Sequence, residues 1–210
     1  MSNNFKDEAT ALQEQLVTWR RDFHAHPELG FQEHRSAAII AEHLKGLDIQ
    51  VQTKVGRTGV VGLLQGTETG PAVMARFDMD ALPLSEENEV SYVSQNPGVM
   101  HACGHDAHIA LGLGVATLMA RYQSAMKGSL KLIFQPDEEG LGGAKAMIED
   151  GVMNHPRTDV FNATHVSTTL PVGTISVETG PVMSAAETGR CSVAGWGGGG
   201  GMRRGGVGAG

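Results

Sequence analysis

The sequence predicts an α/β fold in which helices flank a mixed, largely parallel sheet. Short apolar runs typical of buried strands alternate along the chain with segments whose apolar residues recur at helical spacing. Several of these apolar runs end directly in acidic residues or in histidine. This is the pattern expected where the carboxyl ends of parallel strands meet at one edge of a sheet.

The expected elements begin with an amphipathic helix that Pro27 stops. Its apolar residues follow one another at alternating gaps of four and three, which places them on one face. They are Phe5, Ala9, Leu12, Leu16, Trp19 and Phe23. A second helix is expected over residues 33–47. The later elements are expected to be strands at 49–55, 59–64 and 72–77, a helix after 100–108, a strand at 129–136, a helix at 142–151, and strands at 159–166 and 173–180.

Bulk composition narrows the classes of partner. The 210 residues carry a formal net charge of -7, which argues against a nucleic acid or an anionic membrane as the partner. No apolar run is long enough to span a bilayer. The two cysteines, Cys103 and Cys191, do not form a disulfide framework, and the N-terminal residues lack a secretory signal pattern. We therefore expect a cytoplasmic protein.

The end of the chain differs in kind from the rest. Ten of the sixteen residues in 195–210 are glycine, so this stretch cannot bury a core. We expect residues 1–188 to form one domain and residues 189–210 to be an aberrant or disordered tail.

Side chains of metal-binding types follow three of the predicted strands. They are Asp78 and Asp80 after the first, Glu138 and Glu139 after the second, and His165 after the third. Taken alone, the acidic pairs could be solvated turns and His165 a satisfied core histidine. Taken together, carboxylates and an imidazole at one sheet edge suit a divalent metal ion.

The motif MHACGHDAH (100–108) adds a thiol and three histidines. His101, His105 and His108 would share one face of a continuous helix, but no glutamate lies between them as in a two-histidine zinc helix. A loop entering a helix fits better, with Cys103 and His105 facing one ion and Asp106 near the helix N-terminus. Two alternatives remain: a capped helix with solvated histidines, and a cysteine nucleophile with a histidine base, which leaves the acidic pairs unexplained.

These motifs resemble a known family. It is the metal-dependent amidohydrolases that include hippurate hydrolase, N-acyl-amino-acid hydrolases and indole-acetyl-amino-acid hydrolases, within the aminoacylase and carboxypeptidase superfamily. The matching segments are RRDFHAHPELGFQE (20–33), RFDMDALPLSEEN (76–88), MHACGHDAH (100–108), FQPDEEGLGGAKAMIEDG (134–151) and ATHV (163–166). The resemblance implies a zinc-exopeptidase-like catalytic domain that hydrolyses the amide of a small N-acyl amino acid such as hippurate.

The resemblance also implies a role for each candidate residue. Two divalent ions, Mn or Zn, would be bound by Cys103, His105, Glu139 and His165. Glu138 would be the general base, and Asp80 the acid that supports the site. The remaining candidates, His108, Asp106, Asp78 and His101, would orient the ligands.

The sequence departs from the family pattern in two ways. Phe77 stands where the family usually has alanine. Family members are also nearly twice as long, with a lid and dimerisation domain and a final metal-binding histidine, in place of which this chain has its Gly-rich end. We therefore expect a truncated or frameshifted member that lacks the lid and the C-terminal part of the catalytic domain. Its second metal site would be incomplete and its activity weak or absent; the alternative is a non-catalytic metal-binding fragment.

Overall fold

A computed structural model of the protein describes residues 5–140, 142–177 and 179. The chain divides into two compact units, residues 1–166 and 167–210, and every described helix and strand lies in the first. The helices are α1 (Phe5–Ala11), α2 (Gln13–Ala25), α3 (His34–Gly46), α4 (His105–Arg121) and α5 (Gly143–Glu149), with a 3-10 turn at Gln123–Ala125. The strands are β1 (Gln50–Val55), β2 (Gly59–Gln65), β3 (Glu68–Asp78), β4 (Lys127–Gln135) and β5 (Val160–Ala163).

The strands form one mixed sheet in the order β1-β2-β4-β3-β5. The pairs β3–β4 and β3–β5 are parallel, whereas β1–β2 and β2–β4 are antiparallel. The predicted α/β class with a mixed sheet is confirmed, with parallel and antiparallel pairs equal in number. β4 is the central strand, and all its residues after Lys127 are buried.

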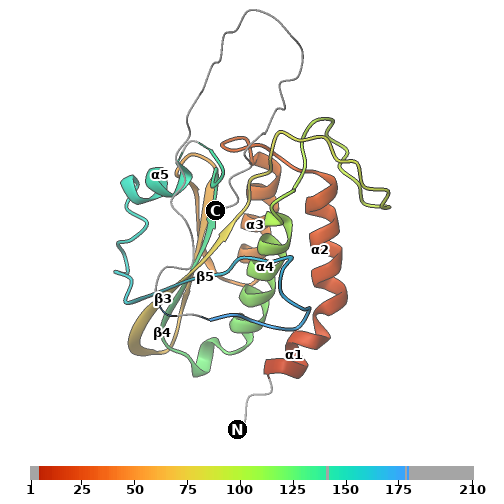
Figure 1. Cartoon of the computed structure of the whole chain (residues 1–210). Helices are drawn as coiled ribbons and strands as arrows, with labels where there is room; N and C mark the ends of the chain where they lie inside the picture. The colour runs from red at the N-terminus through yellow and green to blue at the C-terminus, as the bar shows by residue number, and fades with distance from the viewer. Residues whose placement is uncertain (1–4, 141, 178, 180–210) are drawn as a thin grey trace, which may run out of the picture. The chain divides into compact units, whose positions relative to one another are not determined.

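Helices cover both faces of the sheet. Figure 1 shows α2, α3 and α4 on one side of it and α5 on the other. Side chains alternate between the two layers along β4: Leu132 and Phe134 belong to the core beneath α3 and α4, while Ile133 packs with Met147 of α5. Burial on both faces accounts for the largely apolar sequence of β4, in which the buried Lys131 donates to the backbone carbonyls of Val152, Asn154 and Pro156.

Phe77, the departure from the family pattern, is accommodated by a glycine on α4. Its ring lies 5.6 Å from that of Phe134, between β3 and β4. A Cβ at Gly112 would lie 2.7 Å from Phe134 Cε1 and 2.8 Å from Phe77 Cδ2. The missing side chain at residue 112 therefore lets α4 approach the sheet over two aromatic rings.

Two predicted elements differ from the structure. The first helix is interrupted at Leu12, after the Thr10 hydroxyl donates to the Lys6 carbonyl, a contact that bends helices. The strand predicted at 173–180 is wrong for its described residues, 173–177 and 179, which have no strand structure. Ile175 and Val177 are exposed, and strand-like composition forms no ladder without a paired neighbour. The predicted tail, 189–210, and Cys191 lie outside the described residues.

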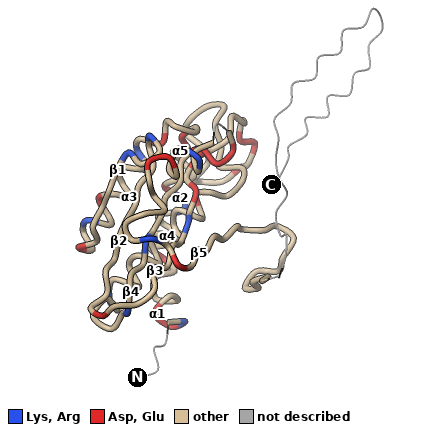
Figure 2. Tube along the Cα trace, turned by 90° about the vertical axis from the view of Figure 1, so that its left-hand side faces the viewer, with Lys and Arg blue, Asp and Glu red and all other residues tan. Residues whose placement is uncertain are grey.

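The surface carries charges of both signs. Figure 2 shows acidic and basic residues interspersed along the trace from α1 to β5. None of the helices in the described part of the chain combines the length and the apolar character needed to cross a membrane.

Candidate metal centre

The parallel strands bring the predicted site residues to one edge of the sheet. β3 lies between β4 and β5 and runs parallel to both, so their carboxyl ends are adjacent. The N-terminus of α4 begins at the same place. The described residues contain three groups of potential metal ligands. His105 belongs to all three, and the ligand atoms of each group lie within 4.8 Å of one another. His105 is joined by Cys103 and His165 in the first group, by Glu138 and Glu139 in the second, and by Asp78 and His108 in the third.

His105 is oriented by a backbone carbonyl just after the end of β3. It is 1% exposed, and its Nδ1 lies 2.9 Å from the backbone carbonyl of Asp80. Because a carbonyl can only accept, Nδ1 carries a proton, and Nε2 is the nitrogen left to bind a metal ion. Nε2 has no hydrogen-bond partner among the described residues and lies 3.9 Å from Glu139 Oε1 and 4.0 Å from Glu138 Oε2. Metal-binding histidines characteristically have this arrangement.

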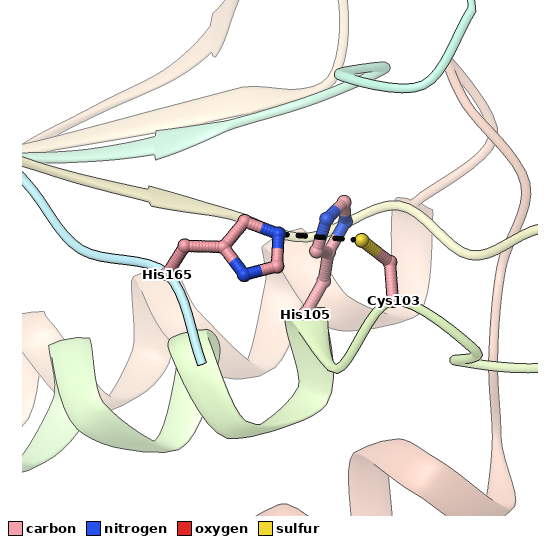
Figure 3. Close-up of side chains that lie close together, drawn as sticks. All are labelled: Cys103, His105 and His165. Atoms are coloured by element: carbon pink, nitrogen blue, oxygen red, sulfur yellow. Dashed lines mark hydrogen bonds between the residues drawn. The ribbon is translucent and has the colours of Figure 1, made fainter. Parts of the chain in front are cut away.

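His165 approaches His105 from the segment after β5, and Cys103 approaches it from the loop before α4. Figure 3 shows the sulfur of Cys103 directed at the His165 ring, with His105 beside both; Cys103 Sγ lies 3.3 Å from His165 Nε2. His165 Nδ1 donates to the Val166 carbonyl over 2.6 Å, so this histidine also turns its Nε2 toward the group. Gly104 permits the approach, since its φ is +85° and a Cβ there would lie 2.6 Å from Val166 Cγ2.

The charges around His105 favour a cation. Burial alone lowers the pKa of His105, but hydrogen bonds to Asp80 and Cys103 and the charges of Asp78 and Asp80 outweigh it and raise the pKa to about 11. Burial raises the pKa of Asp78, yet the His108 hydrogen bond and the nearby charges of His105 and Arg76 lower it to about 2. The buried carboxylates of Asp78 and Asp80 thus stabilise positive charge at His105. A divalent cation bound there would be stabilised by the same charges.

The two alternatives from the sequence fit the structure less well. His101, His105 and His108 are buried rather than solvated. His105 alone lowers the pKa of the Cys103 thiol, but burial and Glu139 outweigh that effect and raise it. Cysteine nucleophiles require a lowered pKa, so the surroundings of Cys103 do not support the role of a nucleophile.

Glu138 differs from its neighbour Glu139 in its contacts. Its side chain is 30% exposed, and Oε1 lies 3.6 Å from a guanidinium nitrogen of Arg76. Burial, followed by the charge of Asp78, raises the pKa of Glu138, against the opposing effect of Arg76. The Glu139 backbone N–H donates to Asp80 Oδ2 over 3.0 Å, which ties the turn that carries both glutamates to the end of β3.

His108 has both ring nitrogens engaged. Its Nε2 accepts the backbone N–H of Val166 over 2.9 Å, so its Nδ1 is the nitrogen that donates to Asp78 Oδ1, over 2.5 Å. This leaves no free lone pair for an ion. His108 instead links Asp78 to the residue that follows His165.

Among the described residues, Asp106 and His101 form no hydrogen bond with the candidate metal ligands. Asp106 accepts from His24 Nδ1 over 2.7 Å and from Arg20 Nε over 2.8 Å, while His24 Nε2 lies 3.0 Å from Glu86. This buried network, which was not predicted, ties α2 and the loop at Glu86 to the start of α4. The Arg20 and His24 pair at helical spacing was its only signal in the sequence. His101 is 3% exposed with no partner for either nitrogen among the described residues, and burial lowers its pKa to about 4.

More than half of the chain matches a protein-family model. The model of peptidase family M20/M25/M40 matches residues 74–199. The chain belongs to this family. The match includes the ends of β3 and β4, the start of α4, and His165, and so contains every candidate ligand described above.

Named relatives agree with this placement. The chain is 41% identical over 196 residues to thermostable carboxypeptidase 2 of Saccharolobus solfataricus, covering 92% of this chain and 49% of the relative. It is 40% identical over 188 residues to an N-acyl-L-amino acid amidohydrolase of Geobacillus stearothermophilus, covering 89% and 50%. Among solved structures, the YXEP protein of Bacillus subtilis, described as a dinuclear metal-binding peptidase of the M20 family, matches with a TM-score of 0.78 and 39% identity over 83% of this chain and 48% of that one. The chain thus spans about half the length of these relatives.

Proposed function

We propose that the protein is a metal-dependent amidohydrolase that cleaves the amide bond of N-acyl amino acids. The observation that carries the proposal is the buried Nε2 of His105, which faces a thiol, an imidazole and two carboxylates without a hydrogen-bond partner among the described residues. The activities named for the relatives support the reaction class. We further propose that residues 1–188 are part of the catalytic domain. We also propose that the protein is cytoplasmic, where the Cys103 thiol would stay reduced.

The residues that would hold the ions are Cys103, His105, Glu139 and His165. Sulfur, nitrogen and oxygen donors of this kind fit two divalent ions, Mn or Zn, and the thiolate favours zinc by intrinsic affinity. When bound, such ions polarise the amide carbonyl and lower the pKa of water. The YXEP structure, described as dinuclear, supports the number of ions.

Glu138 is the proposed general base. It would accept a proton from the attacking water and return it to the leaving amine, the usual cycle of a carboxylate in amide hydrolysis. Its raised pKa brings it closer to the operating pH, and its partial exposure leaves it accessible to substrate. Arg76 would hold the carboxylate on the side of Asp78.

The other candidates would support these groups. Asp80 holds His105 through its carbonyl and the Glu139 amide through its carboxylate. Asp78 and His108 fix the backbone beside His165. Asp106 would act at one remove, by holding α4 against α2. His101 would contribute a buried neutral ring beside the loop that carries Cys103.

The substrate is proposed to be hippurate-like, an aryl-acyl or acyl group joined to an amino acid. The test begins with titration calorimetry of the purified chain with Zn²⁺ and Mn²⁺, followed by hydrolysis of hippurate and a panel of N-acetyl amino acids. We expect metal binding and slow, chelator-sensitive turnover. Binding without turnover on any substrate would support a non-catalytic metal-binding fragment, and turnover insensitive to chelator would refute the proposal.

A Glu138→Gln variant tests the proposed base. We expect turnover to fall by at least about a hundredfold, the usual contribution of a general base, while metal affinity stays near that of the wild type. Glu149→Gln on α5 is the matched control, since this exposed glutamate pairs only with Lys145 on its own helix among the described contacts. Retained turnover in Glu138→Gln would remove Glu138 from the role.

A further inference from the structure

The turn that carries Glu138 and Glu139 is anchored by two buried carboxylates. One is Asp80, which accepts the Glu139 N–H. The other is Glu33, at the start of α3, whose Oε1 accepts the backbone N–H of Asp137 over 2.9 Å. We infer that Glu33 is a positioning residue that holds the Glu138–Glu139 turn in place for metal binding. This inference rests on the proposed function, because it concerns the placement of the proposed ligand Glu139.

Both oxygens of Glu33 are fixed. While Oε1 accepts from Asp137, Oε2 accepts the hydroxyl of Thr58 over 2.5 Å, and the Glu33 residue is 0% exposed. Thr58 lies in the turn between β1 and β2 and is also buried. The carboxylate therefore joins the start of α3, the β1–β2 turn and the end of β4 at one point, with its orientation set by two hydrogen bonds.

The turn has little room to move. Asp137 is 4% exposed and has φ +45°, a left-handed conformation that is uncommon for residues other than glycine. Its Oδ1 lies so close to Gly30 that a Cβ there would be 1.9 Å away. The Asp137 carbonyl accepts the Gly143 N–H over 3.0 Å. A turn held on its amide, carbonyl and side chain determines where the next two side chains point.

Glu33 does not serve the usual structural roles of a carboxylate at a helix start. It makes no capping hydrogen bond to α3. That role falls to Glu28, whose two oxygens accept the N–H groups of Arg35 and Ser36 over 2.8 Å each. Within the described part of the chain no ion pair joins Glu33 to a basic group, and burial raises its pKa. A buried carboxylate without a countercharge costs folding free energy. Among the described residues, the side-chain hydrogen bonds of Glu33 go to the Thr58 hydroxyl and to the Asp137 N–H.

The test compares three variants by calorimetric Zn²⁺ affinity and by thermal unfolding of the metal-free chain. Glu33→Ala removes both bonds, and we expect Zn²⁺ affinity to fall by about tenfold or more, as when other groups that support ligands are removed. Glu33→Gln should stay within about threefold of the wild type, because its amide oxygen can accept from Asp137 and its NH₂ can donate to the Thr58 hydroxyl. Glu28→Ala is the matched control. It removes two hydrogen bonds from a carboxylate to backbone N–H groups at the start of α3, so it should lower the unfolding temperature without changing the Zn²⁺ affinity.

Thr58→Val covers the case in which Glu33→Ala does not fold. It removes only the bond to Oε2 in a side chain of similar shape, and should weaken Zn²⁺ binding by a few fold. Unchanged affinity in folded Glu33→Ala, or in Thr58→Val if that variant alone folds, would overturn the inference while leaving the metal proposal intact. An equal loss of affinity in Glu28→Ala would overturn it as well, since the effect would then be structural. Failure of the wild type to bind Zn²⁺ would overturn the proposed function and the inference with it.

Discussion

Replacing His108 by phenylalanine tests whether the site depends on a side chain that has no free lone pair. Phe keeps a ring of similar size in the buried pocket but removes both nitrogens. The lost contacts are the 2.5 Å bond to Asp78 and the 2.9 Å bond from the Val166 N–H. Asp78 keeps Arg76, whose guanidinium lies 2.6 Å from its other oxygen.

The magnitude follows from these two bonds. A hydrogen bond to a charged group contributes about 1.5–3 kcal/mol and a neutral one about 0.5–1.5 kcal/mol. Because Arg76 still neutralises Asp78, we expect the free energy of unfolding of the His108→Phe variant to fall by about 2–3 kcal/mol. Val166 follows the proposed ligand His165 directly, so the variant should also bind Zn²⁺ about 10–100-fold more weakly, as expected when a group that orients a ligand is lost.

Urea unfolding and Zn²⁺ calorimetry, both below the unfolding temperature of the variant, measure the two effects. His43→Phe is the matched control. His43 on α3 has its Nε2 2.9 Å from the hydroxyl of Thr117 on α4, and among the described residues it has no hydrogen bond to a candidate ligand. It should lose about 1 kcal/mol and keep its metal affinity. Wild-type Zn²⁺ affinity in folded His108→Phe would refute the reasoning.

Three further predictions concern acid stability, packing and metal preference. The pKa of Asp78 is lowered from 3.8 to about 2, so the stabilisation it gives the metal-free protein is present above pH 3.8 and lost as pH falls toward 2. We expect a loss of about 2 kcal/mol in urea unfolding between pH 5 and pH 2, and an Asp78→Asn variant should lack this part of the acid dependence. Gly112→Ala should lower stability by about 1–3 kcal/mol because its Cβ meets Phe134 and Phe77, and a Phe77→Ala background should relieve part of that loss in thermal unfolding. Cys103→Ser should weaken Zn²⁺ binding more than Mn²⁺ binding, since the thiolate is the soft ligand, and equal losses for both ions in calorimetry would contradict its assignment.

The spacing of apolar residues predicted most of the helices and strands, because the burial of one face of each element determines that spacing. The helix expected at 33–47 is α3, and the runs at 49–55, 59–64 and 129–136 correspond to β1, β2 and β4 within two residues. Two elements depart from the prediction: the first helix, which is interrupted at Leu12, and the strand predicted at 173–180. The described residues of this predicted strand have strand composition but expose Ile175 and Val177, and a strand exists only where a second strand pairs with it.

The convergence of the site could also be predicted, because parallel strands end at one sheet edge. The different roles of the histidines could not be predicted from the sequence. His105 and His108 both face the cluster and are both 1% exposed, yet only His105 has a nitrogen without a partner among the described residues. The difference comes from Asp78 and Val166, which lie 30 and 58 residues from His108 in the chain.

The sequence by itself determined the α/β class, the residue types at the strand ends and the motifs that resemble the family. These are local properties, written in the spacing of apolar residues and in short runs such as MHACGHDAH. Only the tertiary structure decided which of these side chains keep a nitrogen without a hydrogen-bond partner among the described residues, and that Glu33 reaches the Asp137 amide across 104 residues of chain. Hydrogen bonds between buried groups depend on which distant segments fold against one another, and no local pattern records that contact.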